Sequence, residues 1–112
     1  MEIKEVLTKI YNAIDDKKGM DIKLIDISQI SSLADYFVIC GGDNINQVHA
    51  IADNGEEQLK KLSLVPSQIE GYQKGNWILM DYKDIVVHIF DKESRGFYNL
   101  DNIWRDGKQV NL

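Results

Sequence analysis

The sequence of 112 residues has one cysteine, one proline, two histidines and no long apolar run. A single thiol cannot build an internal disulfide framework, which favours a reducing, cytosolic compartment. The longest apolar runs, Tyr36–Cys40 and Ile85–Val87, fall far below the roughly 20 residues that a membrane helix needs. The N-terminus is acidic and mixed, without the basic start and apolar core of a signal peptide. We therefore expect a cytoplasmic protein that makes no membrane contact.

Positive charge is also scarce. Thirteen Lys and Arg residues stand against eighteen Asp and Glu residues, which gives a net charge of −5 and a pI near 4.9. Proteins that hold nucleic acid by neutralising phosphates normally carry the opposite sign. No strong direct nucleic-acid binding is therefore expected, and a basic partner suits the charge better. The length and the ordinary composition, 44% hydrophobic and 28% charged, predict one globular domain over residues 1–112.

Apolar periodicity predicts two long helices and five strands. Three- and four-residue spacing predicts helices over residues 3–14 and from Asp43 or Asn44 to about Leu62, with Gly19 as a left-handed cap after the first. A short helix at about 95–104 is expected to pack Tyr98, Leu100, Ile103 and Trp104 inward. The predicted strands are 21–27, 36–40, 68–72, 76–81 and 85–90, the last three joined by turns at 73–75 and 82–84. The order α-β-β-α-β-β-β-α predicts an α/β (α+β) fold, a mixed sheet of about five strands with helices packed on it.

The strands at 76–81 and 85–90 are apolar on both faces, whereas two full helices and a short one are available to cover the sheet. Some apolar area is therefore expected to remain for a partner, and Trp77 is a candidate for it. The alternative, that Trp77 belongs to the core, is equally compatible with the composition.

The turn Gly41–Asn44 joins a predicted strand to a predicted helix, a place where backbone amides can hold a phosphate. It lacks the lysine of a phosphate loop and the third glycine of a dinucleotide fingerprint, and no Asp-x-Asp strand follows it. Asp43 would also place negative charge where a triphosphate would lie. A capped strand-to-helix turn is the favoured interpretation, and no cofactor is expected.

Cys40, His49 and His88 are the only soft or borderline metal ligands, and they lack the paired spacing of a zinc site. No metal site is therefore expected. A nucleophilic arrangement of Cys40, His88 and an aspartate is conceivable, because both residues fall on probable neighbouring strands. A free cysteine at the end of a buried strand usually behaves as a small hydrophobic residue, so no catalytic residues are assigned.

Several runs of residues are distinctive in their order and spacing: Asp35–Cys40, Gln47–Val48, Ile51–Asp53, Glu70–Gly71, Trp77–Tyr82, Asp84–Phe90 and Arg95–Tyr98, with Leu100 and Trp104. Together they resemble the ribosomal silencing factor family, over about residues 6–106. The resemblance implies a fold similar to a nucleotidyltransferase that has lost its catalytic carboxylates. It also implies a non-enzymatic regulator that binds the large ribosomal subunit through ribosomal protein fourteen, blocks joining of the small subunit and slows translation when nutrients are scarce. Organelle relatives are linked to assembly of the large subunit.

The resemblance further implies that Trp77 and Tyr82 belong to the partner surface. Asp81, Lys83 and Asp84 are candidates for the rim of that surface. Lys83 stands where many relatives have glycine, a residue that takes a positive φ freely.

Two alternatives of other classes stay open at this point. One is a small nucleotide-binding or nucleotidyltransferase-like enzyme that uses Gly41, Gly42 and Asp43. The other is a homodimer that buries the spare apolar surface against a second copy.

Overall fold

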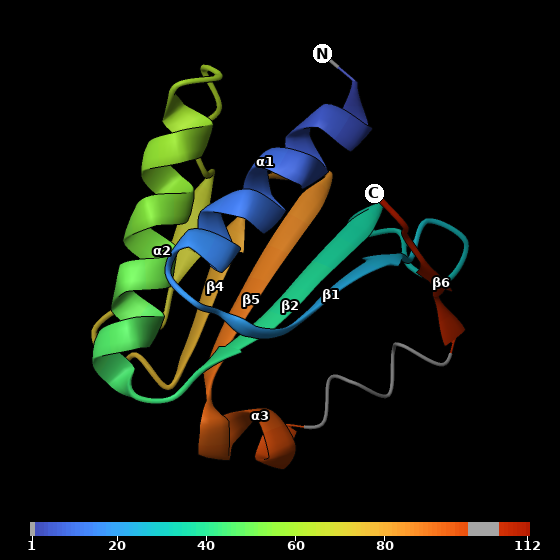
Figure 1. The fold of residues 1–112 in the computed structure, drawn as a ribbon. Coiled ribbons are helices and arrows are strands. Elements are labelled where there is room, and N and C mark those ends of the chain that lie inside the picture. Colours follow the sequence, from blue (N-terminus) through green and yellow to red (C-terminus); the bar gives the residue numbers. More distant parts are fainter. Residues whose placement is uncertain (1, 99–105) are drawn as a thin grey trace.

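The structure, a computed structural model, describes residues 2–98 and 106–112. Within these residues six strands form one mixed sheet in the order β3-β4-β5-β2-β1-β6, as Figure 1 shows. The elements are α1 (Ile3–Asp16), β1 (Met20–Asp26), β2 (Tyr36–Gly42), α2 (Ile45–Lys60), β3 (Gln68–Glu70), β4 (Trp77–Asp81), β5 (Ile85–Asp91), α3 (Lys92–Tyr98) and β6 (Lys108–Gln109). The predicted mixed sheet with helices packed on it is confirmed.

The central strands β2 and β5 run parallel, and the remaining strand pairs are antiparallel. Residues 38–40 of β2 and all but the last residue of β5 are buried, as expected for strands that are covered on both faces. Their register pairs Val38 with Val87 and Ile39 with His88. Side chains alternate between the two faces of a sheet, so this register determines on which face each residue of the two strands lies.

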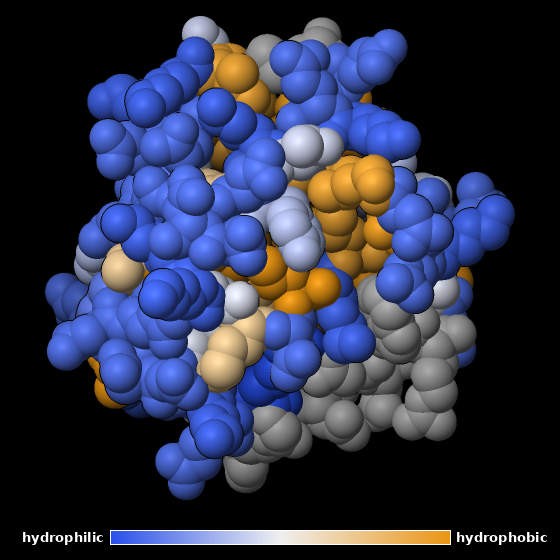
Figure 2. All heavy atoms as spheres, in the orientation of Figure 1, coloured by the Kyte–Doolittle hydropathy of each residue, from blue (hydrophilic) through white to orange (hydrophobic). Residues whose placement is uncertain are grey.

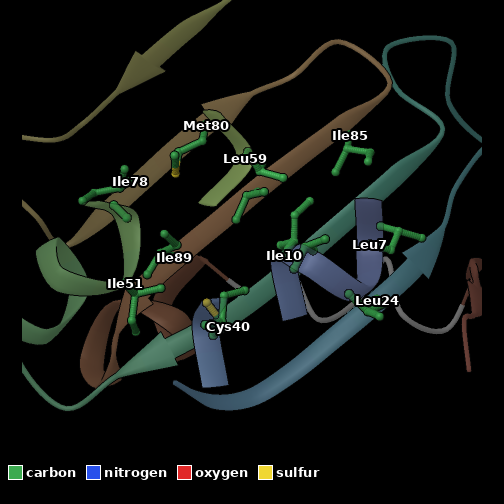
Figure 3. Packing of buried hydrophobic residues seen from close by; sticks show 14 of the residues in the cluster. Leu7, Ile10, Leu24, Cys40, Ile51, Leu59, Ile78, Met80, Ile85 and Ile89 are labelled. Atoms are coloured by element: carbon green, nitrogen blue, oxygen red, sulfur yellow. The ribbon is translucent and has the colours of Figure 1, made fainter. Parts of the chain in front are cut away.

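The larger core cluster lies between the sheet and the two long helices (Figure 3). The apolar stripe of α1 meets that of α2 on this face, and the outer surfaces of both helices carry polar side chains (Figure 2). Its buried members are Val6, Leu7, Ile10, Ile14, Leu24, Val38, Cys40, Val48, Ile51, Ala52, Leu59, Ile78, Met80, Ile85, Val87 and Ile89.

A second cluster occupies the opposite face of the sheet, and no residue of α1 or α2 belongs to it. Its buried members are Ile25, Ile27, Ala34, Ile39, Val86 and Phe90. Phe37, Trp77 and Leu79 pack against this cluster and are only partly buried. Apolar surface therefore remains partly accessible on the face that the two long helices leave uncovered.

Several predicted boundaries differ from the structure. β6 was not expected, because it is a polar two-residue strand that forms only by pairing with Ile25 and Asp26 of β1. β3 ends at Glu70 rather than at residue 72, and β2 extends through Gly42. The final helix begins at Lys92, three residues earlier than expected. Its predicted continuation, with Leu100, Ile103 and Trp104, and the inward packing of Tyr98 lie outside what the structure describes.

The two expected helix caps have different outcomes. The Oδ1 atom of Asn44 accepts a hydrogen bond from the backbone N–H of Gln47 at 2.9 Å, which confirms the cap of α2. Gly19 is not the left-handed residue after α1, because Lys18 has the positive φ of 62°. Gly19 is instead required for close approach, since a Cβ there would lie 2.2 Å from the Cγ2 atom of Ile14. Among the described helices, none is long and apolar enough to cross a bilayer.

Gly55 lies inside α2, where an added Cβ would meet nothing within 4 Å. Alanine restricts the unfolded chain and favours the helix, so Gly55→Ala is expected to raise the free energy of unfolding by about 0.5–1 kcal/mol. Urea denaturation followed by circular dichroism measures this change. Gly71→Ala is the opposite control, because its φ is 76° and its Cβ would lie 2.1 Å from the carbonyl oxygen of Trp77. An unchanged or lower value for Gly55→Ala would contradict the prediction.

Candidate functional site

Trp77 begins β4 and is half-buried on the face that lacks the long helices. Its ring stacks on that of Phe90, the residue paired with it on β5, with ring centroids 5.2 Å apart and ring planes inclined by 22°. Its indole Nε1–H donates a hydrogen bond to Nδ1 of His88 at 3.1 Å. A hollow of about 240 Å³ beside the indole is lined by Glu70, Gly71, Trp77 and Leu79. The indole thus packs inward on the sheet and also borders a surface depression.

The loop that precedes Trp77 is fastened to α2. The hydroxyl of Tyr72 donates to Oδ1 of Asp53 at 2.7 Å, and Nε2 of His49 donates to the carbonyl oxygen of Tyr72. A Cβ at Gly75 would lie 2.6 Å from Cγ2 of Ile45, so this part of the loop also packs closely on α2. These contacts fix the backbone from which Trp77 enters the sheet.

His88 is 4% exposed and lies on the same face of the sheet as Trp77. Because the indole donates to Nδ1, that nitrogen carries the lone pair and the imidazole proton is on Nε2. Among the described residues Nε2 has no hydrogen-bond partner, and the ring of Phe37 packs edge-on at 4.6 Å between centroids. Burial lowers the pKa of His88 from 6.5 to about 4, so the ring is neutral at pH 7.

This lowered pKa predicts that stability depends on pH. Between pH 6.5 and pH 4 the unfolded chain binds a proton at His88 that the folded chain excludes, so stability falls as the pH falls. The expected loss of unfolding free energy by pH 4 is about 3 kcal/mol, measurable by urea denaturation from pH 7 to pH 4. His88→Asn removes the titrating group, and subtracting its profile corrects for carboxylates that titrate in the same range. Parallel profiles for the two proteins would show the prediction to be wrong.

Tyr82 follows β4 directly and is half-buried on the opposite face of the sheet, against the larger core cluster. It borders a small apolar cavity that Gly55, Leu59 and Met80 also line. Its hydroxyl is buried without a hydrogen-bond partner among the described residues. Burial, with a smaller effect from Glu56, raises the pKa of Tyr82 to about 12. The hydroxyl is therefore protonated at any physiological pH.

The structure places Trp77 and Tyr82 apart. They are five positions apart in the sequence, which corresponds to roughly 17 Å along a strand. Trp77 packs against one core cluster and Tyr82 against the other, so they lie on opposite faces of the sheet. Any single surface that includes both has to pass from one face of the sheet to the other, around the outer strand β3 or over the end of β4.

The rim candidates Asp81, Lys83 and Asp84 do lie together, in the turn that contains Tyr82. The N–H of Lys83 donates to Oδ1 of Asp81 at 2.8 Å, and the N–H of Asp84 donates to the Tyr82 carbonyl at 3.0 Å. Lys83 takes a φ of 74°. Together with the hydrogen bond from Asp84 to Tyr82, this φ makes a γ-turn of the rare, strained kind. The Asp84 carbonyl accepts from the N–H groups of Asp35 and Tyr36, which joins the turn to the start of β2.

Glycine at position 83 would adopt this positive φ without steric cost. Lys83→Gly is therefore expected to raise the unfolding free energy by about 0.5–1 kcal/mol, the relief of strain minus the backbone entropy of glycine. Chemical denaturation measures the change. Asp84→Gly is the matched control at a position without positive φ, and there glycine should lower stability. Equal effects of the two substitutions would contradict the explanation.

Side chains of this protein accept the hydrogen bonds of backbone N–H groups in the turn between β2 and α2. The backbone N–H of Asp43 donates to Oε1 of Gln47 at 2.6 Å. The side-chain Nε2 of Gln47 also donates hydrogen bonds to the backbone carbonyls of Lys17 and Lys18, at 3.0 and 2.9 Å. Gly41 and Gly42 are buried within β2 rather than in a loop. This geometry is that of a capped strand-to-helix turn, as the sequence favours.

Cys40 and His88 do not form a nucleophilic pair, so that arrangement is wrong. The register places Cys40 beside Ile89 and His88 beside Ile39, and adjacent residues of a strand point to opposite faces. Cys40 is fully buried in the larger core cluster, where burial raises the pKa of its thiol to about 12. Within residues 2–98 and 106–112 no three His, Cys, Asp or Glu side chains are grouped to hold a metal ion.

Comparison with known proteins decides the family. The family model described as "Ribosomal silencing factor during starvation" matches residues 1–112. The chain belongs to the ribosomal silencing factor family. A ribosomal silencing factor from Halalkalibacterium halodurans is 38% identical over 112 residues, which cover 100% of this chain and 96% of that protein. The resemblance seen in the sequence is therefore confirmed.

Two further proteins extend the ribosomal silencing factor comparison. The crystal structure of a protein from Chromobacterium violaceum has a TM-score of 0.90 and 32% identity, covering 100% of this chain and 92% of that chain. A protein from Mus musculus named for mitochondrial assembly of the ribosomal large subunit is 26% identical over 98 residues. That match covers 85% of this chain and 43% of the mouse protein.

The hydrogen bond between Trp77 and His88 was missed by the sequence analysis. The predicted hairpin around residues 82–84 indicates that the two strands pair, but not the register that brings these two residues together. The structure pairs Trp77 with Phe90 and Leu79 with His88, so His88 lies diagonal to Trp77 on one face. Once the register of a hairpin is specified, such a contact can be anticipated from residue numbers alone.

Proposed function

We propose that the protein is a ribosomal silencing factor that binds the large ribosomal subunit through its ribosomal protein fourteen. Bound there, it obstructs association with the small subunit and represses translation when nutrients are limited. The observation that carries this proposal is the family match over the whole chain. The name of the mouse relative, which refers to the ribosomal large subunit, supports the choice of subunit. A cytoplasmic location follows, because that is where the subunits meet.

The proposed action needs no catalytic group. Obstruction is steric and requires only a folded domain held on a face that the two subunits share. The extents of this chain, 32 × 32 × 23 Å, give it the bulk for such an obstacle. We infer that the protein acts by occupying space rather than by an enzymatic reaction.

Trp77 is the proposed anchor of the partner surface. Aromatic residues that combine a packed ring with an accessible part are over-represented among residues that dominate binding energy. The adjacent hollow can receive a side chain of the partner, and Glu70 gives it an acidic border. A net charge of −5 favours encounter with a basic ribosomal protein.

Tyr82, Asp81, Lys83 and Asp84 form the second part of the proposed surface. They lie at the other end of β4, and two of the three charges there are acidic. A partner that contacts both parts has to reach from one face of the sheet to the other. This requirement predicts that substitutions at either end of β4 weaken the same complex.

The direct test is sedimentation of the purified protein with separated ribosomal subunits through sucrose. We expect the protein to migrate with the large subunit and the fraction of joined ribosomes to fall as its concentration rises. Migration at the top of the gradient would reject the proposed function. Sedimentation of the free protein over a concentration series separates subunit binding from formation of a homodimer through the same surface.

Trp77→Ala is expected to weaken large-subunit binding by about 30-fold or more, the scale of a dominant interface residue. Circular dichroism establishes that the variant is folded before binding is measured by sedimentation. Tyr11→Ala is the matched control, because Tyr11 is an exposed aromatic residue on α1 that borders a hollow beside β1 rather than β4. Normal binding by folded Trp77→Ala would remove Trp77 from the partner surface.

A further inference from the structure

Ring stacking and a hydrogen bond both act on the orientation of the Trp77 indole. Stacking on Phe90 sets the plane of the ring, and the hydrogen bond to His88 sets its rotation within that plane. The acceptor is on β5, a strand buried in the centre of the sheet, so it is itself held rigidly. A tryptophan at the edge of a core cluster could otherwise sample several rotamers.

Core packing alone does not explain a histidine at position 88, because burying its polar ring lowers stability. Its residue partners across the sheet, Leu79 and Ile39, are apolar, and an aliphatic side chain would satisfy the same packing without a polar atom. Among the described residues its Nε2–H has no hydrogen-bond partner, a state that buried polar groups rarely adopt. The one hydrogen bond shown for its ring is the one from Trp77. The imidazole therefore has a specific effect on Trp77 that an apolar residue would lack.

We propose that His88 is the positioning residue of the partner surface, holding the Trp77 indole in its binding orientation before the partner arrives. This inference rests on the proposed function, because it requires Trp77 to be the anchor. Pre-orientation reduces the conformational entropy lost on binding and so strengthens the complex. It also uses the indole N–H internally, so the partner meets the ring face and edge rather than a hydrogen-bond donor.

The test compares two substitutions of His88 in the full-length protein by binding to isolated large subunits. His88→Leu removes the acceptor and is expected to weaken binding about tenfold, the effect of one hydrogen bond. His88→Asn places an amide oxygen near the position of Nδ1 and is expected to bind within about threefold of the parent. Denaturation curves show whether both variants are folded under the binding conditions.

A double-mutant cycle separates positioning from general stability. Trp77→Phe keeps an aromatic ring but removes the N–H donor, so His88→Leu should have little further effect on binding in that background. A merely structural histidine would cost the same affinity in both backgrounds. The indole N–H resonance of Trp77, identified by its loss in Trp77→Phe, should shift or broaden in His88→Leu and stay sharp in His88→Asn.

The outcomes distinguish the two proposals. Normal binding by Trp77→Ala would reject Trp77 as the anchor, and this inference with it. Loss of binding by Trp77→Ala together with parental binding by folded His88→Leu would overturn the role of His88 alone. If His88→Leu does not fold, Trp77→Phe removes the other half of the hydrogen bond, and unchanged affinity in that variant would overturn the role of His88.

Discussion

The parallel pairing of β2 with β5 is the constraint on which the rest of the structure depends. Both strands are largely buried, and their register divides their side chains between two apolar clusters. A shift of β5 by one residue against β2 would move Ile89 to the other face and bring His88 under the helices. The placement of α1 and α2 over one cluster follows from this alignment, and the position of the Trp77 site depends in addition on the pairing of β4 with β5.

Much of the fold could be predicted from local sequence patterns. The unbroken apolar runs identify β2 and β5, and the helical spacing identifies α1 and α2, because burial on a known period leaves a strong signal. β6 could not be predicted, since Lys108 and Gln109 become a strand only through contact with β1. The left-handed residue after α1 was misplaced by one position because Lys18, not Gly19, takes the positive φ.

The candidate site was only partly accessible from the sequence. Family resemblance selects Trp77 and Tyr82, yet their spacing of five positions, an odd number, already indicates opposite faces of an extended strand. The same alternation, applied to paired strands, rules out Cys40 with His88. What local patterns could not supply is the register of each pair, which is set by packing over the whole sheet. The contact between Trp77 and His88 depends on that register.

The separation of Trp77 and Tyr82 onto two faces has a mechanical consequence. A partner that touches both has to contact the two faces of the sheet. A domain held on both faces cannot rock about a single contact point. In the proposed complex a chain of 12.8 kDa obstructs a much larger particle, so resistance to tilting contributes to the obstruction alongside affinity.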